Sequence, residues 1–145
     1  LKIAQESGYP HLMANNLANL GSSLFELDRI SEAKSILEQA LPLCKEVSER
    51  FVYQVAVRLA LISAREGDHD STEALVEESA KLIPNEPQLA MTYWCLRAQI
   101  AHYQARPAEA RELLDLALEI DKVEQYNESH SSKRLINETL ELLRS

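Results

Sequence analysis

Residues 15–41 read NNLANLGSSLFELDRISEAKSILEQAL, and this stretch decides the fold. Apolar and small residues recur along it every three or four positions, which is the spacing of one face of a helix. Gly21 nevertheless stands inside the first half of the stretch. A glycine in a helix interior costs about 1 kcal/mol relative to alanine, so its presence there requires a reason in the packing.

The composition is that of an all-α chain. Its 145 residues suffice for one domain with a core, and 46% of them are hydrophobic. Three glycines and five prolines are too few for the many turns of a β-sandwich. No apolar run approaches the roughly 20 residues that cross a bilayer, and no signal-peptide pattern begins the chain. We therefore expect a single all-α domain located in the cytoplasm.

The chain repeats itself in steps of 39 and then 38 residues. In the first row of positions Leu17, Leu20, Gly21 and Leu24 return as Ala56, Leu59, Ala60 and Ser63, and again as Trp94, Arg97, Ala98 and Ala101. In the second row Ala33, Leu37 and Ala40 return as Thr72, Val76 and Ser79, and then as Ala110, Leu114 and Ala117. Several positions agree at once, so each unit is predicted to be the same structure.

The two rows are separated by turn residues. Asp28 lies between them in the first unit, Gly67 and Asp68 in the second, and Pro107 in the third. A proline is favourable in the first turn of a helix, and Gly-Asp is typical of a helix stop. Each unit is therefore a helix, a short turn and a second helix. We expect the second unit to end at Pro84 and the next helix to begin after Pro87.

Small residues occupy fixed positions of the repeat, and they explain Gly21. They are Gly21, Ala60 and Ala98 in one position, Ala33, Thr72 and Ala110 in another, and Ala40, Ser79 and Ala117 in a third. Small side chains allow two helices to approach closely. We expect the space beside them to be filled by Leu20, Leu37, Leu59, Val76 and Leu114. Gly21 is thus interpreted as a packing residue rather than a hinge.

This pattern resembles the tetratricopeptide repeat signature, W-x2-L-G-x2-Y…A-x3-F…P. Trp94, Leu20-Gly21 and Pro84 each keep a signature residue in place. The resemblance implies a right-handed α-α superhelix of three repeats, at about 14–47, 53–86 and 91–124.

The chain also departs from the usual pattern. No repeat has the signature tyrosine, Arg97 replaces a leucine, and the step exceeds the usual ~34 residues. In this it is similar to the extended variety found in kinesin light chains and in bacterial regulators of the MalT type.

The two ends of the chain suggest a portion of a longer array. Leu1-Lys2-Ile3-Ala4 resembles the end of a second helix, and the chain starts without Met. Residues 130–143 are amphipathic through Leu135, Ile136, Thr139, Leu140 and Leu143. A terminal repeat exposes an apolar face and needs a cap. This helix is predicted to be the cap, or alternatively the first helix of a further repeat.

No motif for catalysis, cofactors or metals is present. The three glycines are isolated, so there is no phosphate-binding loop. The four histidines are scattered, and Cys44 and Cys95 have no metal-ligand spacing. We interpret both cysteines as reduced thiols. We expect no enzymatic activity and no cofactor.

The family resemblance places a binding groove on the first helices of the repeats, with the second helices forming the convex back. Side chains off the packing positions should face that groove. The candidates are Asn15, Asn19, Ser22, Gln54, Arg58, Leu61, Arg65, Thr92, Gln99, His102 and Tyr103. Their amides could bind an extended peptide backbone, and Leu61 and Tyr103 could supply apolar contact.

The charge pattern bears on the partner. The net charge is −8, which disfavours nucleic acid. The first helices carry +1, whereas the second helices and turns carry −9. A near-neutral groove with two central arginines favours an acidic peptide. Chaperone C-termini are excluded as ligands, because the positions of the family's lysine, asparagine and arginine clamp hold Ala18, Ser22, Arg58, Thr92 and Leu96.

The sequence thus predicts a module that binds protein or peptide in its groove, within a larger cytosolic regulatory or scaffold protein. Two alternatives stay open. One is a sensor that binds a small molecule or signal peptide and controls an attached output domain. The other is a purely structural or dimerising segment. The oligomeric state is also open.

Overall fold

The computed structural model describes residues 8–123 and 130–145, and all regular secondary structure in these ranges is helical. The helices are α2 (Tyr9–Glu26), α3 (Ile30–Val47), the 3-10 turn η1 (Glu49–Phe51), α4 (Val52–Glu66), α5 (His69–Ser79), α6 (Pro87–Tyr103), α7 (Pro107–Val123) and α8 (His130–Arg144). None of the described helices is long and apolar enough to span a bilayer. Residues 1–4, which resemble the end of a second helix, lie outside the described residues.

The predicted turn residues end and start the helices. Gly67 follows α4 with a positive φ of 80°, a conformation that glycine adopts without strain. The Asp68 carboxylate then accepts a hydrogen bond from the backbone N–H of Ser71 and caps α5. Pro107 is the first residue of α7, where its missing N–H is harmless. The helix–turn–helix units therefore follow from local chemistry.

The end of the second unit differs from the expectation. Helix α5 stops at Ser79, five residues before Pro84. Ile83 precedes Pro84, and a residue before proline favours extended backbone. Its side chain packs beside the buried cluster of α4 and α6, so the linker contributes to the core. The next helix begins at Pro87 itself, with the Glu86 carboxylate accepting from the N–H groups of Gln88 and Leu89.

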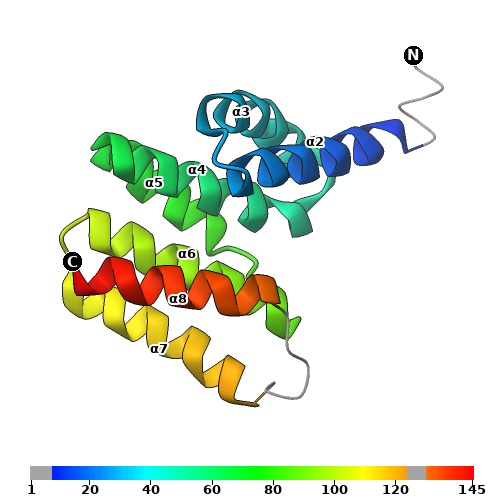
Figure 1. Ribbon diagram of the computed structural model, residues 1–145. Coiled ribbons are helices and arrows are strands. Elements are labelled where there is room, and N and C mark those ends of the chain that lie inside the picture. Colours follow the sequence, from blue (N-terminus) through cyan, green and yellow to red (C-terminus); the bar gives the residue numbers. More distant parts are fainter. Residues whose placement is uncertain (1–7, 124–129) are drawn as a thin grey trace.

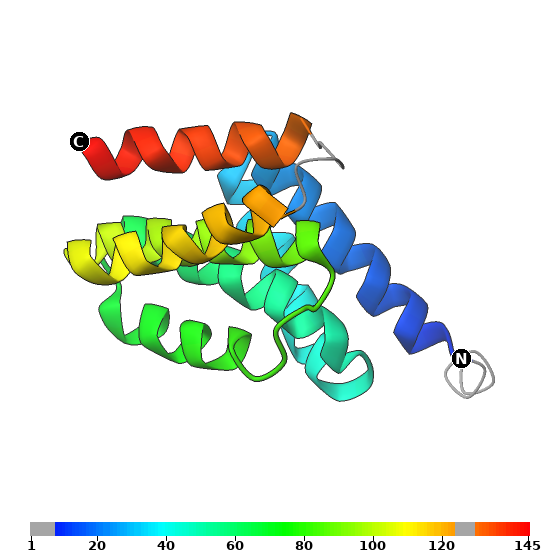
Figure 2. The same ribbon diagram turned by 90° about the horizontal axis from the view of Figure 1, so that it is seen from below.

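The helices pack as successive antiparallel pairs that stack into an all-α solenoid (Figure 1). The pairs are α2–α3, α4–α5 and α6–α7. The first helices also contact one another in order, α2 with α4, α4 with α6, and α6 with α8. In the view from below, α8 lies beside the α6–α7 pair at one end of the stack (Figure 2). This arrangement brings first helices from different repeats to one side.

Gly21 lies in the contact between α2 and α3. A Cβ atom built on it would come within 2.5 Å of Leu37 Cδ2 and 2.7 Å of Leu37 Cγ. Leu37 is fully buried, so it has little room to move away. Any side chain at position 21 would overlap this leucine. The interpretation of Gly21 as a packing residue is confirmed.

One of the expected space-filling leucines does not fill the core. Leu20 is 48% exposed, whereas Leu59, at the same position of the next repeat, is 5% exposed. This position faces the preceding helix pair. Leu59 is covered because α2 and α3 precede it, and its neighbours in the core come from both helices. Among the described residues no helix pair covers the equivalent side of α2.

Helix α8 covers the third repeat. Ile136 and Thr139 are buried, and Leu135, Leu140 and Leu143 pack partly buried against the adjoining core. The helix contacts both α6 and α7, just as α4 contacts both helices of the pair before it, α2 and α3. It therefore stands where the first helix of a further repeat would stand, while covering apolar surface as a cap does.

Candidate functional site: the groove of the first helices

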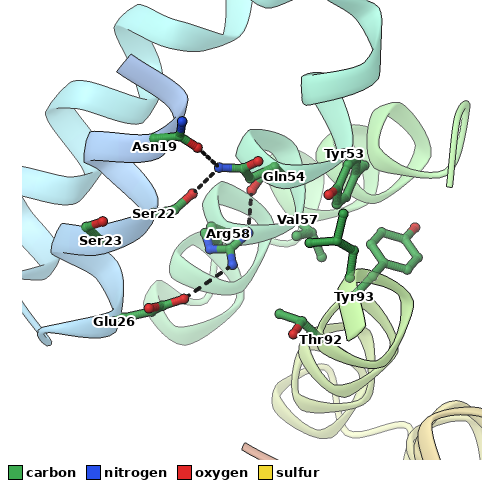
Figure 3. A pocket seen from close by; sticks show the side chains of 11 residues that line it. Asn19, Ser22, Ser23, Glu26, Tyr53, Gln54, Val57, Arg58, Thr92 and Tyr93 are labelled. Atoms are coloured by element: carbon green, nitrogen blue, oxygen red, sulfur yellow. Dashed lines mark hydrogen bonds and ion pairs between the residues drawn. The ribbon is translucent and has the colours of Figure 1, made fainter. Parts of the chain in front are cut away.

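A cavity of about 340 Å³ opens between α2, α4 and α6, and we call it the Arg58 pocket. Its polar lining consists of Asn19, Ser22, Ser23, Glu26, Gln54, Arg58 and Thr92. Its apolar lining consists of Tyr53, Val57, Leu89 and Tyr93. Figure 3 shows the polar side chains of α2 on one side of the pocket and the two tyrosines on the other. The volume lies at the lower end of the range for ligand pockets.

Arg58 is the most unusual residue of this pocket, because it is a cation that is only 7% exposed. Its Nη1 donates a 2.9 Å hydrogen bond to the backbone carbonyl of Gln54, one turn earlier on α4. Its Nη2 lies 3.8 Å from Glu26 Oε1, too far for a hydrogen bond. Its Nε is buried without a hydrogen-bond partner. Buried cations are normally paired and fully hydrogen-bonded. Arg58 therefore has fewer hydrogen bonds than is usual for a buried cation.

The electrostatics agree with that geometry. Burial lowers the pKa of the Arg58 guanidinium, and the nearby Glu26 carboxylate opposes this only in part. An arginine retains its proton even so, because a guanidinium is too weak an acid to lose it inside a protein. The pocket therefore holds a permanent positive charge with a poorly compensated environment, which is a binding environment for an anion.

Gln54 ties the two walls of the pocket together. Its amide nitrogen lies 2.9 Å from Ser22 Oγ and 3.2 Å from both Asn19 Oδ1 and the carbonyl of Ala18. The Ser22 hydroxyl in turn donates to the same Ala18 carbonyl at 2.8 Å. These bonds link α4 to α2 beside Arg58. They position the pocket and already satisfy the amide nitrogen of Gln54.

A second cavity of about 560 Å³ adjoins the first and shares Glu26 and Thr92 with it. We call it the Arg65 pocket. Its other lining residues are Phe25, Asp28, Arg65, Leu96, Gln99, Arg134, Leu135 and Glu138. The Arg65 guanidinium carbon lies 5.9 Å from the Phe25 ring centre and 5.7 Å from that of Tyr103. Both distances are within the range of a cation–π contact, so Arg65 joins the ends of α2, α4 and α6.

The predicted groove residues are only partly brought together. Asn19, Ser22, Gln54, Arg58 and Thr92 line the Arg58 pocket. Arg65, Thr92 and Gln99 line the Arg65 pocket, and Tyr103 touches it through Arg65. His102 packs edge-on against Tyr103. Asn15 lines a separate cavity with His11, Val47 and Phe51, near η1. The two adjoining pockets therefore contain the centre of the predicted surface without its N-terminal end.

Leu61 needs correction because it is buried and lines neither pocket, and Gln99 lines the Arg65 pocket with its amide nitrogen already engaged. Leu61 is 0% exposed and lies in the core cluster of α4 and α6, so it offers no apolar contact to a ligand. Gln99 is 6% exposed, and its amide nitrogen donates a 2.9 Å hydrogen bond to Thr139 Oγ1 of α8. Helix α4 is covered by helices on both sides and α6 by α8, which the spacing rule for one exposed face does not take into account.

Several pocket residues were not among the candidates. Tyr53, Val57 and Tyr93 belong to the apolar wall of the Arg58 pocket, but their helical spacing is that of ordinary core residues. Leu89 is half-exposed at the start of α6. Arg134 and Glu138 come from α8, whose position next to α6 no motif indicated. The sequence offered one signal for Tyr53 and Val57 as pocket residues. Each immediately precedes a candidate on α4, Gln54 or Arg58.

The charged side chains of the second helices are exposed or half-buried, in contrast to the buried Arg58. Their ion pairs join exposed side chains, such as Lys34 with Glu66 at 3.1 Å and Arg106 with Glu73 at 2.9 Å. Glu77 is exposed, and Glu78 pairs with Lys81 and Lys45. Such pairs contribute little because water and salt screen them. These acidic side chains are therefore in contact with solvent or with exposed cations.

Among the described residues, the thiols and acids form no second site. Cys44 and Cys95 are free and fully buried. Burial raises the pKa of both thiols, that of Cys95 to about 12, so both stay protonated and unreactive at neutral pH. Across the described part of the chain, no three His, Cys, Asp or Glu side chains are grouped so that they could hold a metal ion.

Comparison with known proteins supports the repeat assignment. A family model described as Tetratricopeptide repeat matches residues 14–46 and residues 92–124. These segments coincide with the first and third predicted repeats. No curated protein and no solved structure matches the chain. Similarity to the extended variety of the repeat stays a prediction.

Proposed function

This chain carries tetratricopeptide repeats, which generally mediate protein–protein interactions, and we propose that it binds a segment of a partner protein in the groove formed by its first helices. One observation carries this proposal. The Arg58 pocket contains a cation that is 7% exposed and has an unpartnered Nε. A buried cation with incomplete hydrogen bonding lowers stability, so a binding role is a sufficient reason for its position.

The chemistry of the pocket favours an acidic partner segment. A carboxylate can accept two parallel hydrogen bonds from one guanidinium. Arg65 adds a second, exposed cation in the adjoining pocket. The acidic back repels such a segment and leaves the groove as the favourable place. The Arg58 pocket also has apolar walls, so the segment should combine acidic and apolar residues.

The proposal includes the setting of the module. We place it in a larger cytosolic regulatory or scaffold protein, with a binding rather than a catalytic role. We propose that chaperone C-termini are not the ligand, because the clamp positions hold Ala18, Ser22, Arg58, Thr92 and Leu96, and none of these is the residue that the clamp has at that position. Nucleic acid is disfavoured by the net charge of −8.

The test begins with the 145-residue chain as bait and mass spectrometry of the captured proteins. Synthetic peptides from a captured partner are then measured by calorimetry. We expect Arg58→Ala to weaken binding about tenfold or more, since a charge-assisted hydrogen bond contributes roughly 1.5–3 kcal/mol. Arg65→Ala should weaken it less, because Arg65 is exposed. Glu77→Gln on the back is the control. A peptide whose affinity falls with Glu77→Gln but not with Arg58→Ala would place the site outside the groove.

A further inference from the structure

The side edge of the Arg58 guanidinium has no hydrogen-bond partner among the described residues, and its Nε is closed off from solvent, so a ligand can bond to it only after a neighbouring side chain moves. In any arginine the Nε–H and one Nη2–H lie parallel along the same edge, whereas Nη1 points away from it. In this structure Nη1 is engaged by the Gln54 carbonyl. Neither Nε nor Nη2 makes a hydrogen bond, and Nη2 has only the 3.8 Å contact with Glu26. The vacant edge is therefore the one that binds a carboxylate with two parallel bonds.

We propose that this edge is a carboxylate subsite which Glu26 occupies loosely in the free protein and which a ligand carboxylate takes over. The inference rests on the proposed function of the groove and names the group that the groove binds. The Glu26 side chain is 70% exposed, so it can swing into solvent when displaced (Figure 3).

Glu26 is poorly placed to hold Arg58. It is the last residue of α2, where the helix dipole presents its negative end and disfavours a carboxylate. Asp28 lies two residues further on and adds a second negative charge. Glu26 thus neutralises the arginine in part without completing its hydrogen bonds. A ligand carboxylate aligned with the side edge would form the bonds that Glu26 does not.

The residues around the subsite restrict which ligands fit. Val57 and Tyr53 neighbour Arg58 on α4, and Tyr93 and Leu89 face them from α6. Leu89 is 46% exposed, so it can gain burial when a ligand binds. A carboxylate with a large apolar side chain next to it fits both halves of the pocket. The carboxylate can come from an acidic side chain or from a chain terminus, because both present the same group.

The experiment uses three small probes and the ¹⁵N-labelled chain. The probes are N-acetyl-Glu-Leu-amide, N-acetyl-Gln-Leu-amide, and N-acetyl-Gln-Leu with a free C-terminal carboxylate. The Nε–H signal of Arg58 is followed by NMR and identified by its loss in Arg58→Lys. We expect a saturable shift of this signal with the first or the third probe, which tells a side-chain carboxylate from a terminal one. The second probe, which lacks a carboxylate, should leave it in place.

Displacement is tested with a matched pair of variants. Glu26→Gln and Glu77→Gln remove the same charge, one beside Arg58 and one on the back. We expect Glu26→Gln to bind the carboxylate probe about 1.5- to 5-fold more tightly, which corresponds to the strength of an exposed ion pair. Glu77→Gln should match the wild type.

The outcomes separate the two proposals. Equal affinity of Glu26→Gln and Glu77→Gln would overturn displacement while the Arg58 shift still supported an acidic ligand in the groove. If no probe shifts the Arg58 signal in either the wild type or Glu26→Gln, the carboxylate subsite is wrong. A captured partner that still requires Arg58 in calorimetry would then leave only the broader groove proposal standing.

Discussion

The central repeat differs from the two repeats that flank it. The family model matches residues 14–46 and 92–124, and its matches leave out the repeat between them. Helix α5 has 11 residues, whereas α3 has 18 and α7 has 17. Thr72 and Ser79 stand where the flanking repeats have alanines. Arg58, the functional candidate, also belongs to this divergent repeat.

The difference shows which side chains a repeat tolerates when other helices cover it on both sides. Helix α4 buries 12 of its 15 residues, since helices lie on both sides of it. Its partner helix α5 can carry hydroxyls in tight contacts because they find hydrogen-bond partners. Thr72 bonds locally to the Asp68 carbonyl and Ser79 to the Val76 carbonyl, and Ser79 also bonds to the Tyr93 hydroxyl on α6. The flanking repeats keep the family's small apolar residues. The repeat that departs from these small apolar residues is thus the one that contains the buried arginine.

Deleting residues 130–145 should have the largest effect on stability. It removes α8, which covers the third repeat as the third repeat covers the central one. Ile136 and Thr139 would be lost from the core, and Met91 and Cys95 lie in the same cluster. Burial of each large apolar side chain contributes about 1.5–3 kcal/mol, so we expect the free energy of unfolding to fall by more than about 3 kcal/mol. The exposed surface should also promote self-association.

Sedimentation velocity and thermal unfolding measure these two effects of the deletion. Removal of Ser145 alone is the control, since Ser145 is exposed and bonds only to the nearby Leu142 carbonyl. A truncated chain that stayed monomeric and equally stable would show that α8 contributes neither a cap nor a core.

Ala117→Leu should have an intermediate effect and tests the small position that Ser79 occupies in the central repeat. Ala117 is fully buried in the cluster of α6 and α7. Overpacking of a filled core costs typically about 1–3 kcal/mol, so the melting temperature should fall. Glu119→Gln, an exposed change on the same helix, is the control. Identical melting temperatures for the two variants would contradict the proposed register of the repeats.

Most of the fold could be predicted because it depends on local rules. The spacing of small residues located the helix pairs, and Gly67, Asp68 and Pro107 located the turns. The end of α5 was missed because proline restricts the residue before it but does not say where the helix stops. Leu20 was misplaced because repetition predicts equal environments, and among the described residues no helix pair covers α2 in the way that α2 and α3 cover Leu59.

The site could be predicted only in part. Arg58 and Gln54 were found because both lie one turn apart on α4, off the packing positions, and both line the pocket. Leu61 failed because a central helix has almost no exposed face. The incomplete bonding of Arg58 could not be foreseen at all, since it depends on distances between α2 and α4 that no spacing encodes.

The smallest effect is expected at the position shared by Gly21 and Ala60, where opposite substitutions should both destabilise. Gly21→Ala gains about 1 kcal/mol of helix propensity. It also places a Cβ 2.5 Å from Leu37 Cδ2, and overpacking costs about 1–3 kcal/mol, so a net loss of about 1 kcal/mol is expected. In the central repeat Ala60 already has its Cβ in the buried contact, and Ala60→Gly should lose about 1 kcal/mol through propensity alone. Urea unfolding of both variants beside the wild type measures the two losses in the free energy of unfolding. A Gly21→Ala variant more stable than the wild type would mean that α2 and α3 can separate at no cost, and that the glycine is not needed for their contact.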